Sequence, residues 1–131
     1  MTPGKRKGSR FELDVRDYLR ERGYAAERCY GAGRSDDIGD VRGLPGFVIE
    51  AKNQREMRLA EWLTETEVER VNAGEPFGVL VAKRKMKTVA DAYAVMPLRQ
   101  LVDLVDELTR GRCEAAAMHT PLQPGEVLAR S

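Results

Sequence analysis

Apolar positions near the start of the chain repeat in a way that is typical of an amphipathic helix. Over residues 8–22 they recur at steps of four, three and one. The positions on this stripe are Phe11, Val15, Tyr18 and Leu19. Ser9 is the expected N-cap, Glu12 follows it at the spacing of a capping box, and Gly23 is expected to end the helix. The pattern therefore predicts a first helix with one buried face.

Further along, a strand follows a tight turn. Residues 47–52 alternate, so Glu50 and Lys52 share one face, while Phe47, Ile49 and Ala51 point to the other face and suit a core. The Gly/Pro-rich turn at residues 43–46 folds Asp40 back, roughly level with Glu50 and the residue before it. Two carboxylates and one ammonium are expected to converge there. Carboxylate oxygens suit Mg²⁺ or Mn²⁺, and a neighbouring lysine can hold an attacking water or a phosphate oxygen. The pattern therefore predicts metal-assisted phosphodiester hydrolysis.

The rest of the chain continues the alternation of strands and helices. Strands are expected over residues 24–30, 77–82 and 92–96, and helices over residues 59–73 and 98–109. The helix at 59–73 is expected to have a mixed apolar face made of Trp62, Leu63, Thr66, Val68 and Val71. The predicted organisation is one domain over residues 1–110, followed by a poorly ordered tail over residues 111–131.

Charge distribution is more informative than net charge. The chain has 131 residues, which suits one small domain, and its formal net charge is only +1. Basic residues nevertheless gather at the start of the chain and after the strand at 77–82, and one lies in the glycine-rich loop at 31–35. The expected phosphate-contacting residues are Lys5, Arg6, Lys7, Arg10, Arg34, Lys83, Arg84 and Lys85. For the run at 83–85, a solvated hairpin is the simpler alternative.

Several mechanisms are disfavoured by composition. His119 is the only histidine, and it falls in the expected tail. This disfavours a Ser-His-Asp triad, a two-histidine zinc site and a histidine-based nuclease motif. Cys29 and Cys113 form neither a disulfide framework nor a metal-ligand spacing. No apolar run has the length of a membrane span, and the basic start lacks the apolar centre of a signal peptide. The expected location is the cytosol of a bacterium or of a phage-infected host, with no membrane partner.

The element order, with Gly-Asp-Val at 39–41 and Glu-x-Lys at 50–52, resembles the PD-(D/E)XK nuclease superfamily. It is most similar to the small archaeal-type Holliday-junction resolvases and their phage relatives, from about Lys5 to about Thr109. The resemblance implies an α/β, restriction-endonuclease-like core. Its central mixed sheet has about five strands flanked by helices, in the order αβββαββα. The usual proline before the aspartate is replaced here by Gly39.

The resemblance also implies a set of metal ligands. Asp40, Glu50 and the carbonyl of Ala51 are expected to hold Mg²⁺, for which Mn²⁺ can substitute. Glu12 is expected to reach the metal directly or through water, although a capping or solvated role is its alternative. Asp37 competes with Asp40, because its longer spacing to Glu50 matches the archaeal resolvases, and it is kept as an alternative ligand.

Two further residues are expected to act on the attacking water or on a phosphate. Lys52 orients the water and offsets negative charge, unless it is simply a solvated lysine at the end of its strand. Gln54 orients the water or a phosphate, or is only a polar residue leaving the strand. Trp62 is expected to pack its helix or to lie in a dimer interface, rather than to stack on a base.

The implied substrate is DNA, most specifically a four-way junction cut by a symmetric homodimer to give 5′-phosphate and 3′-hydroxyl ends. The helix at 59–73 and that at 98–109 are both candidates for the dimer interface. Because one fold serves many substrates, a less structure-selective or restriction-like endonuclease stays open as an alternative. A non-catalytic DNA-binding module on the same fold is the other alternative.

Overall fold

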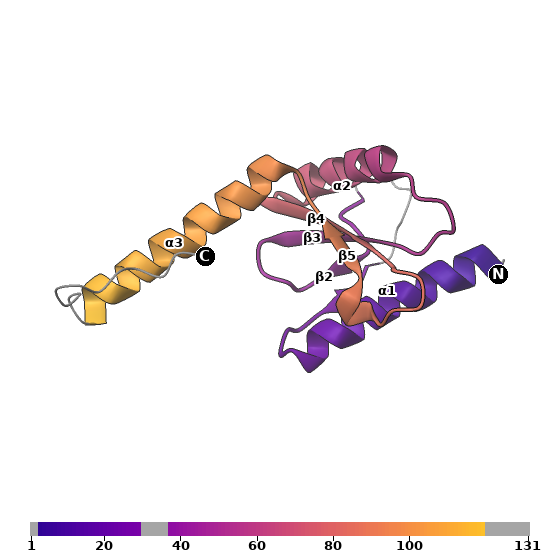
Figure 1. Ribbon diagram of the computed structural model, residues 1–131, viewed down its shortest axis with the longest axis horizontal. Helices are drawn as coiled ribbons and strands as arrows, with labels where there is room; N and C mark the ends of the chain where they lie inside the picture. Colours follow the sequence, from indigo (N-terminus) through magenta and orange to yellow (C-terminus); the bar gives the residue numbers. More distant parts are fainter. Residues whose placement is uncertain (1–2, 30–36, 120–131) are drawn as a thin grey trace. The chain divides into compact units, whose positions relative to one another are not determined.

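The computed structural model describes residues 3–29 and 37–119, with side chains described for residues 6–29 and 37–111. The chain divides into two compact units, Met1–Pro97 and Leu98–Ser131. The described part of the first unit contains a five-stranded mixed sheet between two helices (Figure 1). The predicted α/β class with a five-stranded mixed sheet is confirmed, and the described elements follow one another as in the predicted order. The predicted domain boundary at residue 110 stays a prediction.

The strands lie in the sheet in the same order as in the sequence, β1-β2-β3-β4-β5. They are β1 (Glu27–Arg28), β2 (Val41–Arg42), β3 (Phe47–Lys52), β4 (Phe77–Ala82) and β5 (Tyr93–Val95). The central pair, β3 and β4, is parallel, and the other pairs are antiparallel. Since parallel neighbours need a crossover, helix α2 (Leu59–Ala73) connects them. Its predicted bounds are confirmed, and Gly74 ends it in the left-handed conformation at φ 68°.

The outer strands are shorter than the pattern predicts. Strand β1 covers only two of the residues expected over 24–30, of which residue 30 lies outside the described part. Its partner β2 is equally short, because the turn beginning at Gly43 follows at once. A Cβ at Gly43 would lie 2.5 Å from the Ala25 carbonyl oxygen, so this close approach requires glycine.

Helix α1 (Pro3–Glu21) begins earlier than predicted, so Ser9 is not its N-cap. Proline is favoured in the first turn, and the lysines and arginines that follow are good helix formers. Ser9 therefore lies within the helix, where its Oγ accepts a hydrogen bond from Arg28 Nη2 at 3.0 Å. The capping-box alternative for Glu12 is wrong for the same reason.

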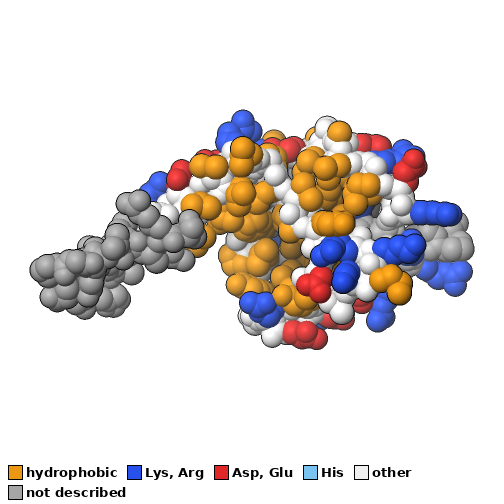
Figure 2. Space-filling model, viewed as in Figure 1, with side chains coloured by type: hydrophobic (Ala, Val, Ile, Leu, Met, Phe, Trp, Pro, Cys, Tyr) orange, Lys and Arg blue, Asp and Glu red, His pale blue; other side chains and the backbone are white. Residues whose placement is uncertain are grey.

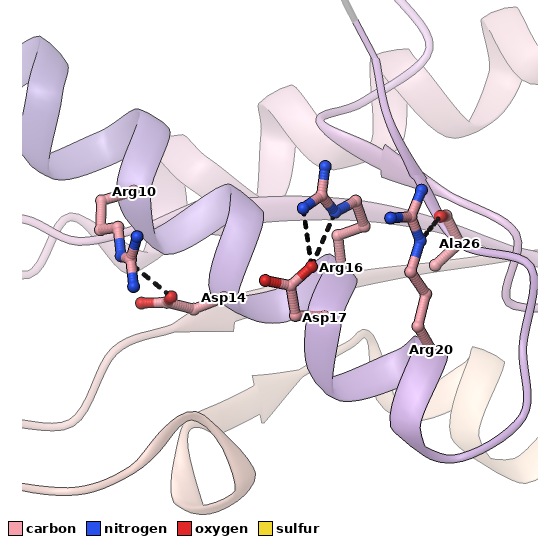
Figure 3. A network of polar contacts seen from close by, with 6 residues as sticks. All are labelled: Arg10, Asp14, Arg16, Asp17, Arg20 and Ala26. Atoms are coloured by element: carbon pink, nitrogen blue, oxygen red, sulfur yellow. Dashed lines mark hydrogen bonds and ion pairs between the residues drawn. The ribbon is translucent and has the colours of Figure 1, made fainter.

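Polar contacts cover the outer side of α1 (Figure 3). Arg10 Nε lies 3.2 Å from Asp14 Oδ1 one turn along the helix. In the last turn, Arg20 Nε donates to the carbonyl oxygen of Ala26 at 2.8 Å. Exposed ion pairs such as Arg10–Asp14 contribute little stability. The Arg20 bond does more, because it ties the end of α1 to the segment that leads into β1.

Helices α1 and α2 cover opposite faces of the sheet (Figure 1). The core under α1 is entirely aliphatic and aromatic, and consists of Phe11, Val15, Leu19, Ala26, Val41, Ile49, Ala51 and Val79. The core under α2 is smaller and consists of Trp62, Leu80 and Ala82, with Leu63 and Val95 packed against them. Ile49 and Ala51, with Phe47 packed beside them, thus face α1, as the alternation predicts. Trp62 is buried, so it packs its helix against the sheet.

The inward face of α2 differs from the predicted one. Val68 and Val71 are 55% and 66% exposed, whereas Thr66 and Glu69 are buried beside Trp62. The apolar positions of this helix do not form one stripe, so the hydrophobic pattern left its orientation ambiguous. Packing against β3 and β4 chooses the face that carries Glu69.

Helix α3 (Leu98–His119) forms the described part of the second unit and extends beyond the predicted end at residue 109. Gly111 does not stop it, because the alanine-rich residues that follow are strong helix formers and one glycine costs only about 1 kcal/mol. His119 is the last helical residue, and residues 120–131 lie outside the described part. Among the described residues, no helix has the length and apolarity needed to cross a bilayer.

Candidate active site

Asp40 is placed beside β3 by the glycine that precedes it. Gly39 adopts φ 97°, and a Cβ there would lie 2.7 Å from Val48 Cγ1 and 2.9 Å from the Ile49 carbonyl oxygen. The backbone amide of Asp40 donates to that same carbonyl at 2.8 Å. Its carboxylate Oδ2 in turn accepts a hydrogen bond from the Ala51 amide at 2.9 Å. Asp40 is buried next to Glu50, as the hairpin predicts.

Glu50 and Lys52 extend from the face of β3 that is covered by α2. Glu50 is only 2% exposed, and its Oε2 has no hydrogen-bond partner within the described residues. Burial, together with the carboxyl groups of Asp40 and Glu69, raises the pKa of Glu50 far above its usual range. Lys52 Nζ lies 3.1 Å from Glu65 Oε2. Partial burial lowers the pKa of Lys52, but the negative charges of Glu50 and Glu65 outweigh this and raise it, so Lys52 keeps its proton.

A cavity of about 210 Å³ brings the predicted catalytic and metal-binding residues together. Its lining consists of Gly8, Glu12, Asp37, Asp40, Glu50, Ala51, Lys52, Asn53, Gln54 and Glu65. These residues come from α1, the segment before β2, the end of β3 and α2. Side chains that are far apart in the sequence therefore share one concave, acidic site.

Glu12 reaches this site from α1 and is held by an arginine that the sequence analysis did not single out. Arg28 Nε lies 2.6 Å from Glu12 Oε2, and both side chains are largely buried. Burial and the nearby Asp40 carboxyl raise the pKa of Glu12, while the Arg28 guanidinium opposes that shift. Arg28 lies on β1, so only the fold brings it beside Glu12.

Asp37 also lines the cavity, but its carboxylate has a local role. Its Oδ1 accepts a hydrogen bond from the Gly39 amide at 2.9 Å, and its carbonyl oxygen accepts one from Asn72 Nδ2 at 3.0 Å. The first bond forms an Asx-type turn that leads into Asp40, and the second ties this segment to α2. Asp37 thus orients the approach to the site while remaining within its lining.

Two glutamates of α2, Glu65 and Glu69, were missed as site residues. They lie one helical turn apart on the helix face that packs against β3. One carboxylate oxygen from each, together with one from Glu50, fits within 4.8 Å of the others. Burial raises the pKa of Glu69 to about 7. The available signal was a glutamate at a helical step from Trp62, on the inward face of the helix.

A second, basic pocket lies next to the acidic cavity. Its volume is about 680 Å³, and it is lined by Lys7, Asn53, Gln54, Arg55, Lys83, Lys85 and Met86. Gln54 lines both pockets. Lysine and arginine side chains gather where the start of α1 meets the loops after β3 and β4 (Figure 2). This grouping includes three of the predicted phosphate-contacting residues and adds Arg55.

The other predicted DNA-contacting residues are more scattered. Arg6 and Arg10 are exposed on α1, where Arg10 pairs with Asp14. The guanidinium of Arg84 lies 5.2 Å from the centre of the Tyr93 ring, and its Nη1 donates to the Asp91 carbonyl oxygen at 3.4 Å. The side chain of Lys5 and all of Arg34 lie outside the described part of the chain.

The donor set fits a hard divalent cation. Carboxylate oxygens are the ligands that Mg²⁺ and Mn²⁺ prefer, and the Glu50 oxygen without a partner is buried at the centre of the site. No protein-family model matches this chain, and no curated protein is similar enough to match it.

Proposed function

We propose that this protein is a metal-dependent endodeoxyribonuclease of the PD-(D/E)XK type. The observation that carries this proposal is the shared cavity, in which Asp40, Glu50 and Lys52 meet Glu12 and Gln54. Acidic oxygens next to a protonated lysine form the donor set that hydrolysis of an anionic diester requires. The restriction-endonuclease-like order of strands and helices supports the same assignment.

Mg²⁺ or Mn²⁺ would be held by Asp40, Glu50 and the Ala51 carbonyl, with Glu12 beside them. When bound, it would supply the positive charge that favours deprotonation of water and stabilises the departing oxygen. The Ala51 amide keeps the Asp40 carboxylate oriented through its 2.9 Å bond. Lys52, which remains protonated, offers its ammonium to the attacking water or to a phosphate oxygen. Gln54 is placed between the acidic cavity and the basic pocket to orient the same groups.

The basic pocket suits the sugar-phosphate backbone on either side of the cut. Lys7, Lys83 and Lys85 come from α1 and from the loop after β4, and they surround Gln54 with positive charge. Such contacts bind any DNA sequence and weaken as salt is added. A phosphodiester held there would have its neighbouring phosphate near the carboxylates.

Four-way junction DNA is the proposed substrate, cut by a homodimer that presents two sites. This refinement rests on the resemblance to the small resolvases. A less structure-selective endonuclease would use the same cavity, and a DNA-binding module would use the basic pocket alone.

A cleavage assay with a Glu50→Ala control tests the proposal. The purified protein is incubated with Mg²⁺ or Mn²⁺ and labelled four-way junction, fork, duplex or single-stranded DNA. We expect paired cuts in the junction, and we expect Glu50→Ala to lose them while it keeps its affinity for DNA. Glu61→Ala is the matched control, because Glu61 is exposed on α2 and pairs only weakly with Arg58, at 3.6 Å.

Each outcome selects one function. Equal cutting of all substrates would support a general endonuclease and reject the junction resolvase. Binding without cutting, in either metal, would reject the nuclease and leave the DNA-binding module. Cleavage that persists in Glu50→Ala would show that the carboxylate cavity is not the active site.

A further inference from the structure

The face of α2 that packs against β3 carries an acidic cluster beside the cavity already described. Glu50 comes from β3, and Glu65 and Glu69 come from α2. One oxygen of each lies within 4.8 Å of the others, which is close enough for all three to contact one ion. Neither glutamate of α2 belongs to the predicted set of metal ligands.

A second observation distinguishes this cluster from ordinary surface acidity. Glu69 is only 2% exposed, and within the described residues neither of its carboxylate oxygens has a hydrogen-bond partner. Glu50 Oε2 is also buried without a hydrogen-bond partner among the described residues, and Glu50 belongs to the same cluster. A buried carboxylate without partners costs several kcal/mol unless a charge or a proton compensates it. Two such residues in one cluster require compensation, either by a proton or by a cation.

The charge balance gives the charge that a bound cation would have to supply. When a cation replaces their protons, the three carboxylates contribute three negative charges, and Lys52, which contacts Glu65 at 3.1 Å, returns one positive charge. The difference is two negative charges, which a divalent cation would neutralise. Arg28 does not help here, because it is paired with Glu12.

We propose that Glu50, Glu65 and Glu69 form a divalent-cation site that ties α2 to β3. It is distinct from the site at Asp40, although Glu50 borders both. The cation class is Mg²⁺ or Mn²⁺, since the three ligands are all hard oxygens. This site goes beyond the proposed nuclease, because a cation there joins two elements of the fold whether or not the chain cuts DNA.

Counting bound Mn²⁺ tests this site independently of DNA cleavage. Equilibrium dialysis of the whole chain is expected to give two Mn²⁺ per molecule for the wild type and one for Glu69→Gln. Asp40→Asn is expected to lose the other ion, and Glu61→Gln to keep both. Glu65→Gln serves as a second variant that cannot disturb the core, because its side chain is 43% exposed. We expect it to weaken the same ion at least about tenfold.

Tb³⁺ luminescence identifies which ion each variant loses. Trp62 is the only tryptophan, and it lies on α2 one turn before Glu65 and Thr66. Excitation selective for tryptophan should therefore sensitise Tb³⁺ bound at this cluster. The signal should persist in Asp40→Asn and fall in Glu69→Gln, with circular dichroism confirming that both variants are folded.

The possible failures are distinguishable. If the wild type binds one Mn²⁺ that Asp40→Asn loses and Glu69→Gln keeps, the cation site on α2 is wrong and the nuclease proposal stands. If the single ion is instead lost in Glu69→Gln and kept in Asp40→Asn, the α2 site stands and the metal site of the proposed nuclease is wrong. Two ions retained in folded Glu69→Gln would also overturn the α2 site.

Discussion

The two faces of strand β3 differ in what they bury. Toward α1, Ile49 and Ala51 join an apolar core in which no charge needs compensation. Toward α2, Glu50 is buried to nearly the same extent as Ile49, with a carboxylate oxygen that has no partner among the described residues. One six-residue strand thus carries apolar core packing on one face and a buried carboxylate without a partner among the described residues on the other.

The face of β3 toward α1 contributes stability, and the face toward α2 carries the groups of the candidate active site. Apolar burial contributes roughly 25 cal/mol for each Å² removed from water, whereas burial of unpaired carboxylates opposes folding. The α1 face therefore holds the fold together. The α2 face keeps charged groups in a site where a cation or a substrate can compensate them.

Lys52→Met should have the largest effect, and that effect should fall mainly on catalysis. It removes the ammonium that faces the cavity and pairs with Glu65, but keeps most of the length of the apolar side chain. We expect DNA cleavage to fall about 100- to 1,000-fold, as happens when one preorganised donor to the transition state is lost. Single-turnover kinetics and urea unfolding measured on the same preparation check this prediction. Loss of stability in step with activity would show that Lys52 is mainly structural.

Ile49→Ala, on the opposite face of the same strand, should have the converse effect. Ile49 is fully buried under α1, so its truncation leaves a cavity, and we expect the free energy of unfolding to fall by about 3 to 4 kcal/mol. Cleavage per folded molecule should be nearly unchanged, since Glu50 and Lys52 face the other way. Urea denaturation with and without Mg²⁺ measures the loss. A large drop in activity with intact stability would show that the two faces are not independent.

The pH dependence of stability should give the smallest effect, and it should come from the α2 face. Burial raises the pKa of Glu69 from 4.5 to about 7, with Glu50, Asp37, Asp40 and Glu65 around it. The folded state then binds the proton more tightly than the unfolded state. The resulting stability is fully present below pH 4.5 and is lost as the pH rises through about 7. The loss should reach up to about 3 kcal/mol in the presence of EDTA.

Urea unfolding at about pH 5 and about pH 8 measures this loss. Glu69→Gln should reduce the dependence and leave the part that comes from the raised pKa of Glu50, and Mn²⁺ should restore stability to the wild type at the higher pH. Glu61→Gln is the control on the exposed side of the same helix. An equal pH dependence in wild type and Glu69→Gln would exclude Glu69 as its source.

Local sequence signals predicted the central elements correctly. Strands β3 and β4 and helix α2 have the expected bounds, because alternation, a continuous apolar run and a terminal glycine are strong short-range signals. The ends of the chain were harder. Ser9 was predicted to be the N-cap of α1, and α3 was predicted to end before Gly111. Both residues instead lie within their helices, because the residues on either side of each are good helix formers.

The candidate site was predicted in part. Asp40, Glu50 and Lys52 could be placed because one turn and one strand set their positions, and the hydrogen bond from Ala51 to Asp40 agrees with the expected register. Arg28 and Glu69 could not be found in this way. Each reaches the site from a different element, and their partners are distant in the sequence.

The sequence alone specified a hairpin that aligns Asp40, Glu50 and Lys52. Strand alternation and turn-forming residues act over only a few positions, so they can be read from the sequence. It also specified which face of β3 is apolar. The rotation of α2 was specified only by packing, since its apolar positions allow more than one buried face. That rotation brings Glu65 and Glu69 against Glu50, because Trp62 fills the space over Leu80 and Ala82 and carries the rest of the helix face with it.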